Sequence, residues 1–543
     1  MNYLLAFFTA MLVSVAITPL MIQLAPRLGM VDLPDPRKVH SSPIPRVGGI
    51  GIVIGTLVAV RIWVPMDSSM YAYLFGSVVL LAFGMWDDCR ELGHYVKFIG
   101  QFIAVIAVVY YGNTFVHQLP FREMSPIPPD IGKPFTVFAM VGMINAANHS
   151  DGLDGLAGGL SVLSLVCIAY LALPVNGSLI ITMAAATLGG VLGFLRYNTH
   201  PARVFMGDGG SQFLGFTLGF LAVALTQNVN TALSPALPAL FLGLPIIDIL
   251  AVFAQRVYHR MNWFRASKNH IHHRLLELGF DHYEAVVIIY SVQTLFVVSA
   301  IFLRYQSGWL IVSLYLGVCA AIFALLTLAE HHGWRAHRHQ NRLNAQTVIT
   351  FFNRHGLLAD RPLKLVTAAI PVLFLVVSVS ATRVPYDFGV GACLCAALLL
   401  LQLAFSRQPG SVVLRAINYV TASFIIYLND RYTIARFPHL ATAEIVYFIV
   451  LAAAIGLAVR YTKHVDFKTT PMDYLVLFVV LSVGILTHDS RQQAELGAMA
   501  MKLVVVFYGC ELITSRMKSR WNLLNMSSFA TLLLLGLRGL GLA

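Results

Sequence analysis

Long apolar runs are the feature of this sequence that most limits its fold. Of the 543 residues, 58% are hydrophobic and only 11% are charged, whereas soluble globular chains carry roughly 25% charged residues. Many runs reach the length of about 20 residues at which an α-helix crosses a bilayer, and they exceed the short strands of a membrane barrel. The sequence therefore predicts an all-α, polytopic membrane protein.

The apolar segments fall into two groups on either side of a polar interval. We expect a membrane domain at residues 1–330 with about 11 helices, a cytoplasmic polar linker at 331–363, and a C-terminal membrane domain at 364–543 with about 7 further helices. The predicted segments of the first domain lie near 3–24, 47–66, 71–86, 98–111, 134–147, 155–173, 178–195, 211–227, 235–254, 284–303 and 309–328. Those of the second lie near 364–382, 387–406, 412–428, 441–459, 472–487, 495–514 and 523–541, and the sequence assigns them no role.

The distribution of positive charge predicts an orientation. The net charge is +12, and in a polytopic protein such an excess is typical of cytoplasmic loops rather than of nucleic-acid binding. Lys and Arg concentrate in alternate loops, which predicts an outside N-terminus. The cytoplasmic face then receives five polar segments, at 32–49, 87–97, 145–155, 196–211 and 262–275. We therefore expect an active site at this face, bordered by membrane lipid.

The first of the chemically informative motifs is a pair of carboxylates at a helix end, Asp87-Asp88. Adjacent carboxylates can hold a divalent cation, or one can act as a base while the other orients it. The alternative is a solvated helix end. Lys97 opens the next helix, where it could meet a lipid phosphate or serve as an interfacial anchor.

The stretch from Asn145 to Gly159 is unusually polar for a segment next to a bilayer, and such residues are expensive there. In a helix, Asn148 and Asp151 share a face, and Asp154 extends it. The glycines would let a ligand approach the backbone closely. The alternative interpretation is a pair of Asx caps with a glycine turn. The Asp-Gly pair occurs twice in this stretch, however, which favours a functional role.

A third carboxylate, Asp208, lies where a helix is expected to begin, in Phe-Met-Gly-Asp-Gly-Gly-Ser. It could be a helix cap or a Mg²⁺ ligand that works together with substrate phosphates. Phe205, in the same motif, could stack on a flat base or pack against its neighbours.

Two basic segments could contact phosphate. The segment from His270 to Arg274 carries His270, His272, His273 and Arg274, which favours phosphate and sugar contacts over a transition metal because the spacing is unlike that of zinc sites. The loop with Lys38 and Arg46 is basic and rich in glycine. It could bind phosphate, or it could be a simple turn. The intramembrane Asp248 is either a structural partner of a broken helix or part of the pocket.

Together, and in this order, the motifs resemble the polyprenyl-phosphate N-acetylhexosamine-1-phosphate transferases of glycosyltransferase family 4, over about residues 1–330. The resemblance implies a bundle of ten or eleven helices in a bacterial inner membrane, with Mg²⁺ as the cofactor and Mn²⁺ as its alternative. It implies transfer of a sugar-1-phosphate from a UDP-N-acetylhexosamine to undecaprenyl phosphate, with release of UMP. A homodimer is left open, and nucleic acid is not an expected partner.

The resemblance also suggests roles for the individual residues. Asp87 would be the base with Asp88 beside it, and Asp208 would hold the metal, with Asp151 as the second choice. The full set of expected catalytic residues is Asp87, Asp88, Asp151, His272 and His273. With the basic loop included, the expected substrate-binding residues are Lys38, Arg46, Lys97, Asn145, Asn148, Asp154, Asn198, Phe205, His270 and Arg274.

Three functional readings remain at this stage. The His-Ile-His-His motif from His270 favours transfer of N-acetylglucosamine-1-phosphate or a related simple sugar, in the initiation of a cell-surface polysaccharide. The alternative within the family is the phospho-N-acetylmuramoyl-pentapeptide transferase of peptidoglycan synthesis, which usually shows three consecutive histidines. A lipid-linked sugar transporter is the rival from another class, but it would place its carboxylates near the midplane.

Overall fold

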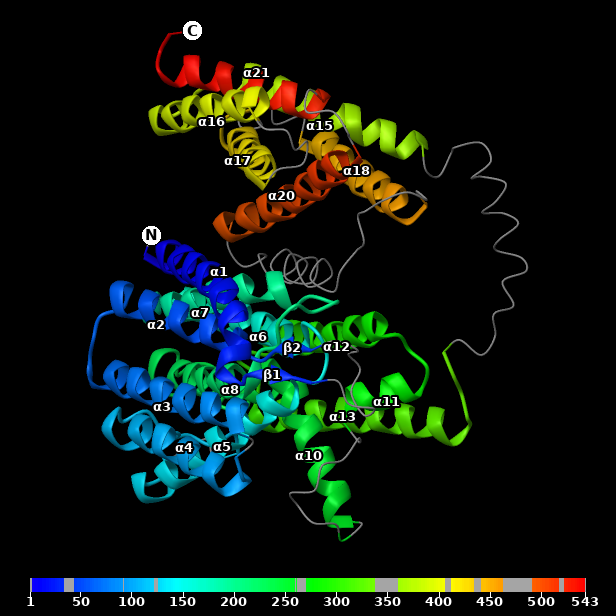
Figure 1. Cartoon of the computed structure of the whole chain (residues 1–543). Coiled ribbons are helices and arrows are strands. Elements are labelled where there is room, and N and C mark those ends of the chain that lie inside the picture. Colours follow the sequence, from blue (N-terminus) through cyan, green and yellow to red (C-terminus); the bar gives the residue numbers. More distant parts are fainter. Residues whose placement is uncertain are drawn as a thin grey trace. The chain divides into compact units, whose positions relative to one another are not determined.

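The computed structural model is almost entirely helical (Figure 1). It describes residues 2–33, 43–90, 92–121, 126–258, 260, 270–336, 360–405, 412–433, 441–461, 491–516 and 522–542. Among these residues, nine helices are long and apolar enough to cross a membrane. The prediction of an all-α, polytopic membrane protein is therefore confirmed.

The described residues form two compact units, one up to residue 336 and one from residue 360 onward. Unit 1 contains the helices α1 (Asn2–Leu28), α2 (Gly48–Trp63), α3 (Ser68–Arg90), α4 (His94–Ile106), η1 (Ala107–Tyr111), α5 (Pro129–His149), α6 (Leu156–Ala172), η2 (Leu173–Val175), α7 (Ser178–Asn198), α8 (Gly207–Val223), η3 (Ala224–Val229), α9 (Pro238–Phe241), α10 (Gly243–Tyr258), α11 (Ile271–Glu277), α12 (His282–Phe302) and α13 (Gly308–His331). Its two short strands, β1 (Val31–Asp32) and β2 (Ile44–Pro45), pair antiparallel.

The centre of unit 1 is α8, which packs against α3 and α5 and also contacts α2 and α6. Its residues from Gly209 to Val223 are all buried. The approach of α3 to α8 depends on Gly84, because a Cβ there would lie 2.2 Å from the Cα of Gly209. This close crossing brings the C-terminal end of α3 beside the N-terminal end of α8.

The apolar segment predicted at 235–254 is broken into α9 and α10 at Leu242. Pro245 has no N–H, so it cannot donate to the carbonyl of Phe241 four residues earlier. That carbonyl accepts hydrogen bonds from Ser164 Oγ at 2.6 Å and Gln293 Nε2 at 2.8 Å instead. Side chains of α6 and α12 therefore provide the hydrogen bonds that the Phe241 carbonyl lacks at the break between α9 and α10.

The inter-helix loops of unit 1 meet in two sets, one at each end of its helices. At one end, Phe205 N donates to Pro45 O at 2.8 Å, and the ends of α3 and α8 meet. At the other end, Gln227 Oε1 accepts from His117 N at 3.0 Å, and Ser234 N donates to Arg304 O at 2.9 Å. Helices that cross a membrane in alternating directions would place their loops in two such sets.

Unit 2 is a second helical bundle with its own apolar core. It contains α15 (Asp360–Ser380), α16 (Tyr386–Phe405), α17 (Val412–Leu428), η4 (Asn429–Thr433), α18 (Ala441–Tyr461), α20 (Arg491–Arg516) and α21 (Leu523–Gly539). The segment predicted at 472–487 lies outside the described residues. Helix α21 packs on α15 and α16, and α20 packs on α17 and α18.

Candidate active site

Asp208, the second residue of α8, is the hub of a polar cluster at one end of unit 1. Its Oδ2 lies 2.8 Å from Lys97 Nζ, and the same Nζ lies 2.6 Å from Asp87 Oδ2. The Asp87 and Asp208 side chains also lie within hydrogen-bonding reach of each other. A single ammonium group thus bridges the last turn of α3 and the first turn of α8.

Asp88 fixes the start of α8. Its Oδ1 accepts a hydrogen bond from Asp208 N at 3.0 Å, and its Oδ2 accepts one from Gly209 N at 3.4 Å. Two of the first N–H groups of α8 are therefore satisfied by a side chain of another helix. Gly207 has φ +73° and a Cβ there would lie 2.5 Å from Asp88 Oδ2, so the turn requires glycine.

Asn148, in the last turn of α5, holds the other Asp208 oxygen. Its Nδ2 lies 3.1 Å from Asp208 Oδ1 and 2.9 Å from Ser211 Oγ. Asn145, one turn earlier, is linked to the same carboxylate by a relay of two buried amides. Asn145 Nδ2 donates to Gln101 Oε1 at 2.8 Å, Gln101 Nε2 donates to Gln212 Oε1 at 3.2 Å, and Gln212 Nε2 lies 3.4 Å from Asp208 Oδ2.

Asp151 belongs to the electrostatic surroundings of this cluster. It follows the C-cap residue of α5, Ser150, and its N–H donates to Asn148 O at 3.2 Å. Burial, together with the carboxylates of Asp208 and Asp154, raises the pKa of Asp151 to about 7. The repulsion between Asp151 and the carboxylates of Asp208 and Asp154 is an interaction that a bound cation would relieve.

The histidines of α11 are anchored by the intramembrane Asp248. Its carboxylate accepts from His270 Nδ1 at 2.8 Å and from Ile271 N at 2.8 Å, so it caps α11 and joins it to α10. Asp248 thus has a structural role in positioning α11, and its part in the pocket stays a prediction. His270 also stacks on His149, with ring centroids 5.1 Å apart.

His272 lies directly over the loop that carries Asp151. A Cβ on Gly152 would lie 2.2 Å from His272 Nε2, so the backbone and the ring are in close contact. Its ring centroid is 4.3 Å from that of His273. Burial and the neighbouring His273 lower the pKa of His272 to about 3, and the imidazole is neutral at pH 7.

The basic residues proposed to bind substrate have partners within the protein. The Arg274 guanidinium is bidentate on Glu330 of α13, with Nε and Nη2 each 2.7 Å from a carboxylate oxygen. Arg46 Nη2 is paired with Asp32 across the β1–β2 ladder, and its charge acts on Asp88 and Asp151. Lys38 lies outside the described residues.

The remaining predicted residues stabilise the loops around the cluster. Asn198 Oδ1 accepts from Gly155 N at 2.9 Å and its Nδ2 donates to Val204 O at 2.8 Å, so it joins two loops. Asp154 Oδ2 lies 2.7 Å from His200 Nδ1. Phe205 contacts the segment before α2 through its backbone, since Gly48 N donates to Phe205 O at 2.9 Å. Direct substrate contact by these residues stays a prediction.

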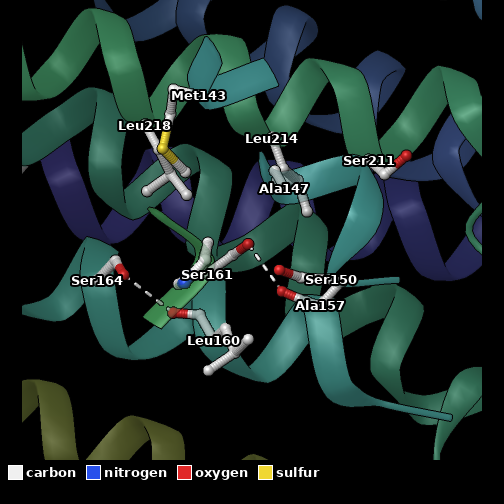
Figure 2. A pocket seen from close by; sticks show the side chains of 11 residues that line it. Met143, Ala147, Ser150, Ala157, Leu160, Ser161, Ser164, Ser211, Leu214 and Leu218 are labelled. Carbon is white, nitrogen blue, oxygen red and sulfur yellow. Dashed lines mark hydrogen bonds between the residues drawn. The ribbon is translucent and has the colours of Figure 1, made fainter. Parts of the chain in front are cut away.

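A small cavity lies between α5, α6, α8 and α10 (Figure 2). Four serines line it, and the hydroxyls of Ser161 and Ser164 donate to the carbonyls of Ala157 and Leu160 at 2.8 and 3.1 Å. Its volume of about 10 Å³ suits a single water molecule. It is a feature of helix packing and not a nucleotide pocket.

Several residues of the cluster escaped the sequence analysis. Gln101 and Gln212 lie inside apolar helices, and their only sequence signal is a polar residue in a spanning segment. Ser211 is part of the Asp208 motif, but no role was assigned to it. His149 is within the Asn145–Gly159 stretch but was not singled out. His200 and His282 have no local motif.

Comparisons with known proteins agree with the motifs. Residues 70–226 match the family described as glycosyl transferase family 4. A Bacillus subtilis protein named "Probable undecaprenyl-phosphate N-acetylglucosaminyl 1-phosphate transferase" is 36% identical over 307 residues, which are 56% of this chain and 86% of the relative. The chain belongs to glycosyl transferase family 4.

Two further relatives are also similar to this chain. An undecaprenyl-phosphate alpha-N-acetylglucosaminyl 1-phosphate transferase of Haemophilus influenzae is 30% identical over 63% of this chain and 97% of the relative. A decaprenyl-phosphate N-acetylglucosaminephosphotransferase of Mycobacterium leprae is 31% identical over 52% of this chain and 79% of the relative. The family resemblance inferred from the motifs is therefore confirmed.

Proposed function

We propose that this chain transfers N-acetylglucosamine-1-phosphate, or a related N-acetylhexosamine-1-phosphate, from a UDP-sugar to undecaprenyl phosphate. UMP is released, and the lipid product initiates a cell-surface polysaccharide. The names of the relatives support the reaction. The observation that carries the proposal is the cluster in which Asp87, Lys97 and Asp208 meet at the ends of three helices.

The residues of this cluster fit a magnesium site. Mg²⁺ prefers oxygen ligands and is typically held by one or two carboxylates together with substrate phosphates. Asp208 would be the main ligand, and Asp151, whose carboxyl group interacts electrostatically with that of Asp208, would be the second. When bound, Mg²⁺ would neutralise charge on the diphosphate of the donor.

The side chains of the cluster have separable tasks in this reaction. An oxygen of the lipid phosphate forms the new bond to the β-phosphorus, and the bridging oxygen leaves with UMP. Lys97 offsets the repulsion between the two polyanions. Asp87, 2.6 Å from Lys97, is placed to accept a proton from the lipid phosphate, although the phosphate needs little help because its second pKa is near 6. Asp88 is a positioning residue that fixes Asp208.

The proposed orientation places this cluster at the cytoplasmic face of the bacterial inner membrane. It rests on the distribution of positive charge among the loops and on the meeting of the loops in two sets. The two alternatives have weaker support. None of the relatives named above is a muramoyl-pentapeptide transferase or a transporter.

A transfer assay with substitutions in the cluster tests the proposal. The purified chain is incubated with labelled UDP-N-acetylglucosamine, undecaprenyl phosphate and Mg²⁺, and labelled lipid and UMP are quantified. We expect Asp208→Asn to abolish Mg²⁺-dependent turnover, because the variant keeps the shape of the side chain and loses its charge. Lys97→Gln should reduce turnover on the order of 100-fold, as removal of an electrostatic stabiliser does elsewhere.

The matched control is Asp360→Asn, an exposed carboxylate of unit 2, which should leave turnover unchanged. Near-normal turnover of Asp208→Asn would refute the metal role of Asp208. If the wild-type chain formed neither labelled lipid nor UMP from any UDP-N-acetylhexosamine, the proposed reaction would be wrong.

A further inference from the structure

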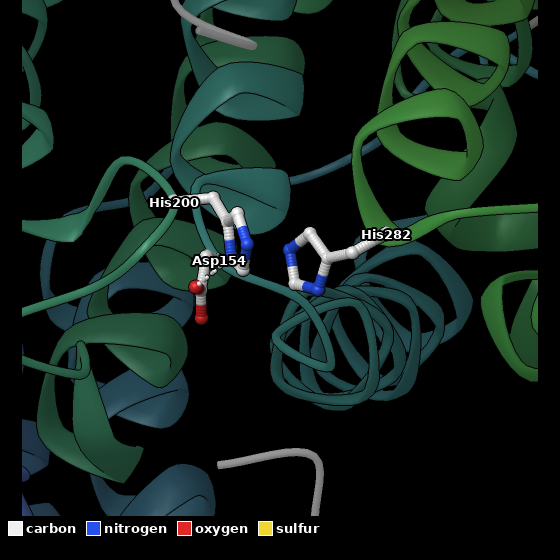
Figure 3. A group of neighbouring side chains, drawn as sticks. All are labelled: Asp154, His200 and His282. Atoms are coloured by element: carbon white, nitrogen blue, oxygen red, sulfur yellow. Dashed lines mark hydrogen bonds and ion pairs between the residues drawn. The ribbon is translucent and has the colours of Figure 1, made fainter.

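Three side chains outside the Asp208 cluster gather where two loops meet the start of α12 (Figure 3). They are Asp154 from the loop between α5 and α6, His200 from the loop after α7, and His282, the first residue of α12. One potential ligand atom from each lies within 4.8 Å of the others. Segments separated by 46 and 82 residues in the sequence thus supply one carboxylate and two imidazoles to one point.

The contacts within the group leave ligand positions available. Asp154 Oδ2 lies 2.7 Å from His200 Nδ1 and accepts from Ala202 N at 3.1 Å. The His200 and His282 rings stack, with centroids 4.3 Å apart and planes 24° apart. His282 lies within hydrogen-bonding reach of the main chain of Asp154, but neither of its two buried ring nitrogens makes a hydrogen bond of ordinary geometry to the described residues. An imidazole left in this state loses the solvation of both nitrogens, which is costly without a ligand.

The scaffold that carries the three side chains is well fixed. Asp281 and Glu284 form a capping box at the start of α12, which holds the backbone of His282. The Asp154 loop is held by Asn198, which accepts from Gly155 N, and by Tyr290, whose hydroxyl donates to Gly155 O at 2.7 Å. Hydrogen bonds behind the candidate ligands are the usual way in which a metal site orients its ligands.

We propose that Asp154, His200 and His282 bind one divalent transition-metal ion of the Zn²⁺ class. Two imidazoles and one carboxylate form an established ligand set for such ions, with an open fourth position for water. This chemistry differs from that of the oxygen-only cluster around Asp208, and the inference does not rest on the proposed transferase function.

To receive an ion, the stacked rings of His200 and His282 would have to rotate so that a nitrogen of each ring points to the same position. Metal bonds of about 2.0–2.1 Å in a tetrahedral site hold the ligand atoms about 3.3 Å apart. The 2.7 Å contact between Asp154 and His200 would therefore open slightly, and His282 would move closer. The His200 side chain is 42% exposed, which gives an ion access from solvent. The bound metal would link both loops to α12, and one of these loops also carries Asp151.

Metal binding by the full-length chain tests this inference. The protein is purified in detergent without a polyhistidine tag, stripped with EDTA and titrated with Co²⁺, whose visible absorption reports tetrahedral coordination, or with Zn²⁺. We expect one equivalent to bind to the wild type and to raise its melting temperature. His200→Gln and His282→Gln should each weaken binding at least about 10-fold, in line with loss of a ligand. The matched control His331→Gln, at the exposed end of α13, should bind as the wild type does.

A second measurement needs no substitution. Histidine modification by diethylpyrocarbonate, followed by mass spectrometry, should show Zn²⁺ protecting His200 while His331 reacts equally with and without metal. Equal Co²⁺ affinity in all four proteins would overturn the inference, as would unchanged modification of His200. Failure of the stripped wild type to bind Co²⁺ or Zn²⁺ at micromolar concentration would also overturn it, whatever its transferase activity.

Discussion

At the scale of single residues, His272 shows how burial decides the chemistry of a side chain. The sequence predicted phosphate and sugar contacts for this segment, but His272 is only 4% exposed, and the neighbouring His273 also disfavours a positive charge on it. A neutral imidazole can donate and accept hydrogen bonds but cannot attract a diphosphate as a cation. Its close contact with Gly152 places this neutral group over the loop that carries Asp151.

The lowered pKa predicts a pH dependence of stability. The pKa of His272 falls from 6.5 in the unfolded chain to about 3 in the folded chain. Between these values the unfolded chain binds more protons, so the folded state is fully stable above pH 6.5 and loses stability as the pH falls toward 3. At pH 5 the cost is about 2 kcal/mol, since it grows by about 1.4 kcal/mol per pH unit below 6.5.

Thermal unfolding of the wild type and of His272→Gln at pH 7.5 and pH 5 measures this effect. The wild type should lose more stability between the two values than the variant, by about 2 kcal/mol. His331→Gln controls for the removal of an exposed histidine and should behave as the wild type does. An equal acid sensitivity of the wild type and His272→Gln would mean that His272 is protonated in the folded state.

At the scale of helices, the site depends on how closely α3 and α8 cross. Gly84 faces the backbone of Gly209, so the two helices approach within a distance that excludes any side chain. Only at that distance can Asp88 accept the hydrogen bonds of Asp208 N and Gly209 N. The geometry of the carboxylate cluster is therefore set by the contact at Gly84, which precedes Asp87 and Asp88 by three and four residues in α3.

Gly84→Ala should separate these helices. The added Cβ would lie 2.2 Å from Gly209 Cα, and a backbone atom cannot rotate away, so we expect overpacking of about 1–3 kcal/mol or more. Turnover should fall further than the loss of stability alone explains. Gly142→Ala, where a Cβ meets nothing within 4 Å, is the matched control. Wild-type melting temperature and turnover in Gly84→Ala would contradict the close crossing.

Helix positions were predictable from the sequence, because hydropathy and length suffice to identify spanning segments. A broken helix near Asp248 was one interpretation of the sequence, but the position of the break at Leu242 was not predictable, since it depends on Ser164 and Gln293 from other helices to satisfy Phe241 O. The position of Asp208 followed from its motif. Its ties to Gln101 and Gln212 did not, because pairings between helices leave no periodic signal along one helix.

At the scale of the whole molecule, unit 2 shows that a membrane bundle outside the region of family resemblance also buries charge. Lys502 Nζ of α20 lies 2.7 Å from both Asp430 Oδ1 and Glu444 Oε1. The three side chains are largely buried, with 12–20% of their surface exposed. Charges inside a bundle must be paired in this way, because an isolated one is expensive.

Removal of the single ammonium should destabilise unit 2 strongly. Lys502→Met leaves Asp430 and Glu444 without their shared partner, and breaking a buried pair of this kind costs about 3–5 kcal/mol. The triple variant Lys502→Met, Asp430→Asn, Glu444→Gln should recover most of the loss, because no charge is then unpaired. Melting temperatures in detergent measure both. A triple variant no more stable than Lys502→Met would show that the ion pairs are not the cause.

The two ends of unit 1 should face opposite sides of the membrane. Cys89, exposed at the carboxylate end of α3, and Gln306, exposed between α12 and α13 at the other end, are suitable reporters. We expect a membrane-impermeant maleimide to label Gln306→Cys, in a Cys89→Ser background, on intact spheroplasts. Native Cys89 should react only after permeabilisation, because positively charged loops are retained inside. Cys89→Ser alone gives the background from the other cysteines, and labelling of Cys89 on intact spheroplasts would reverse the proposed orientation.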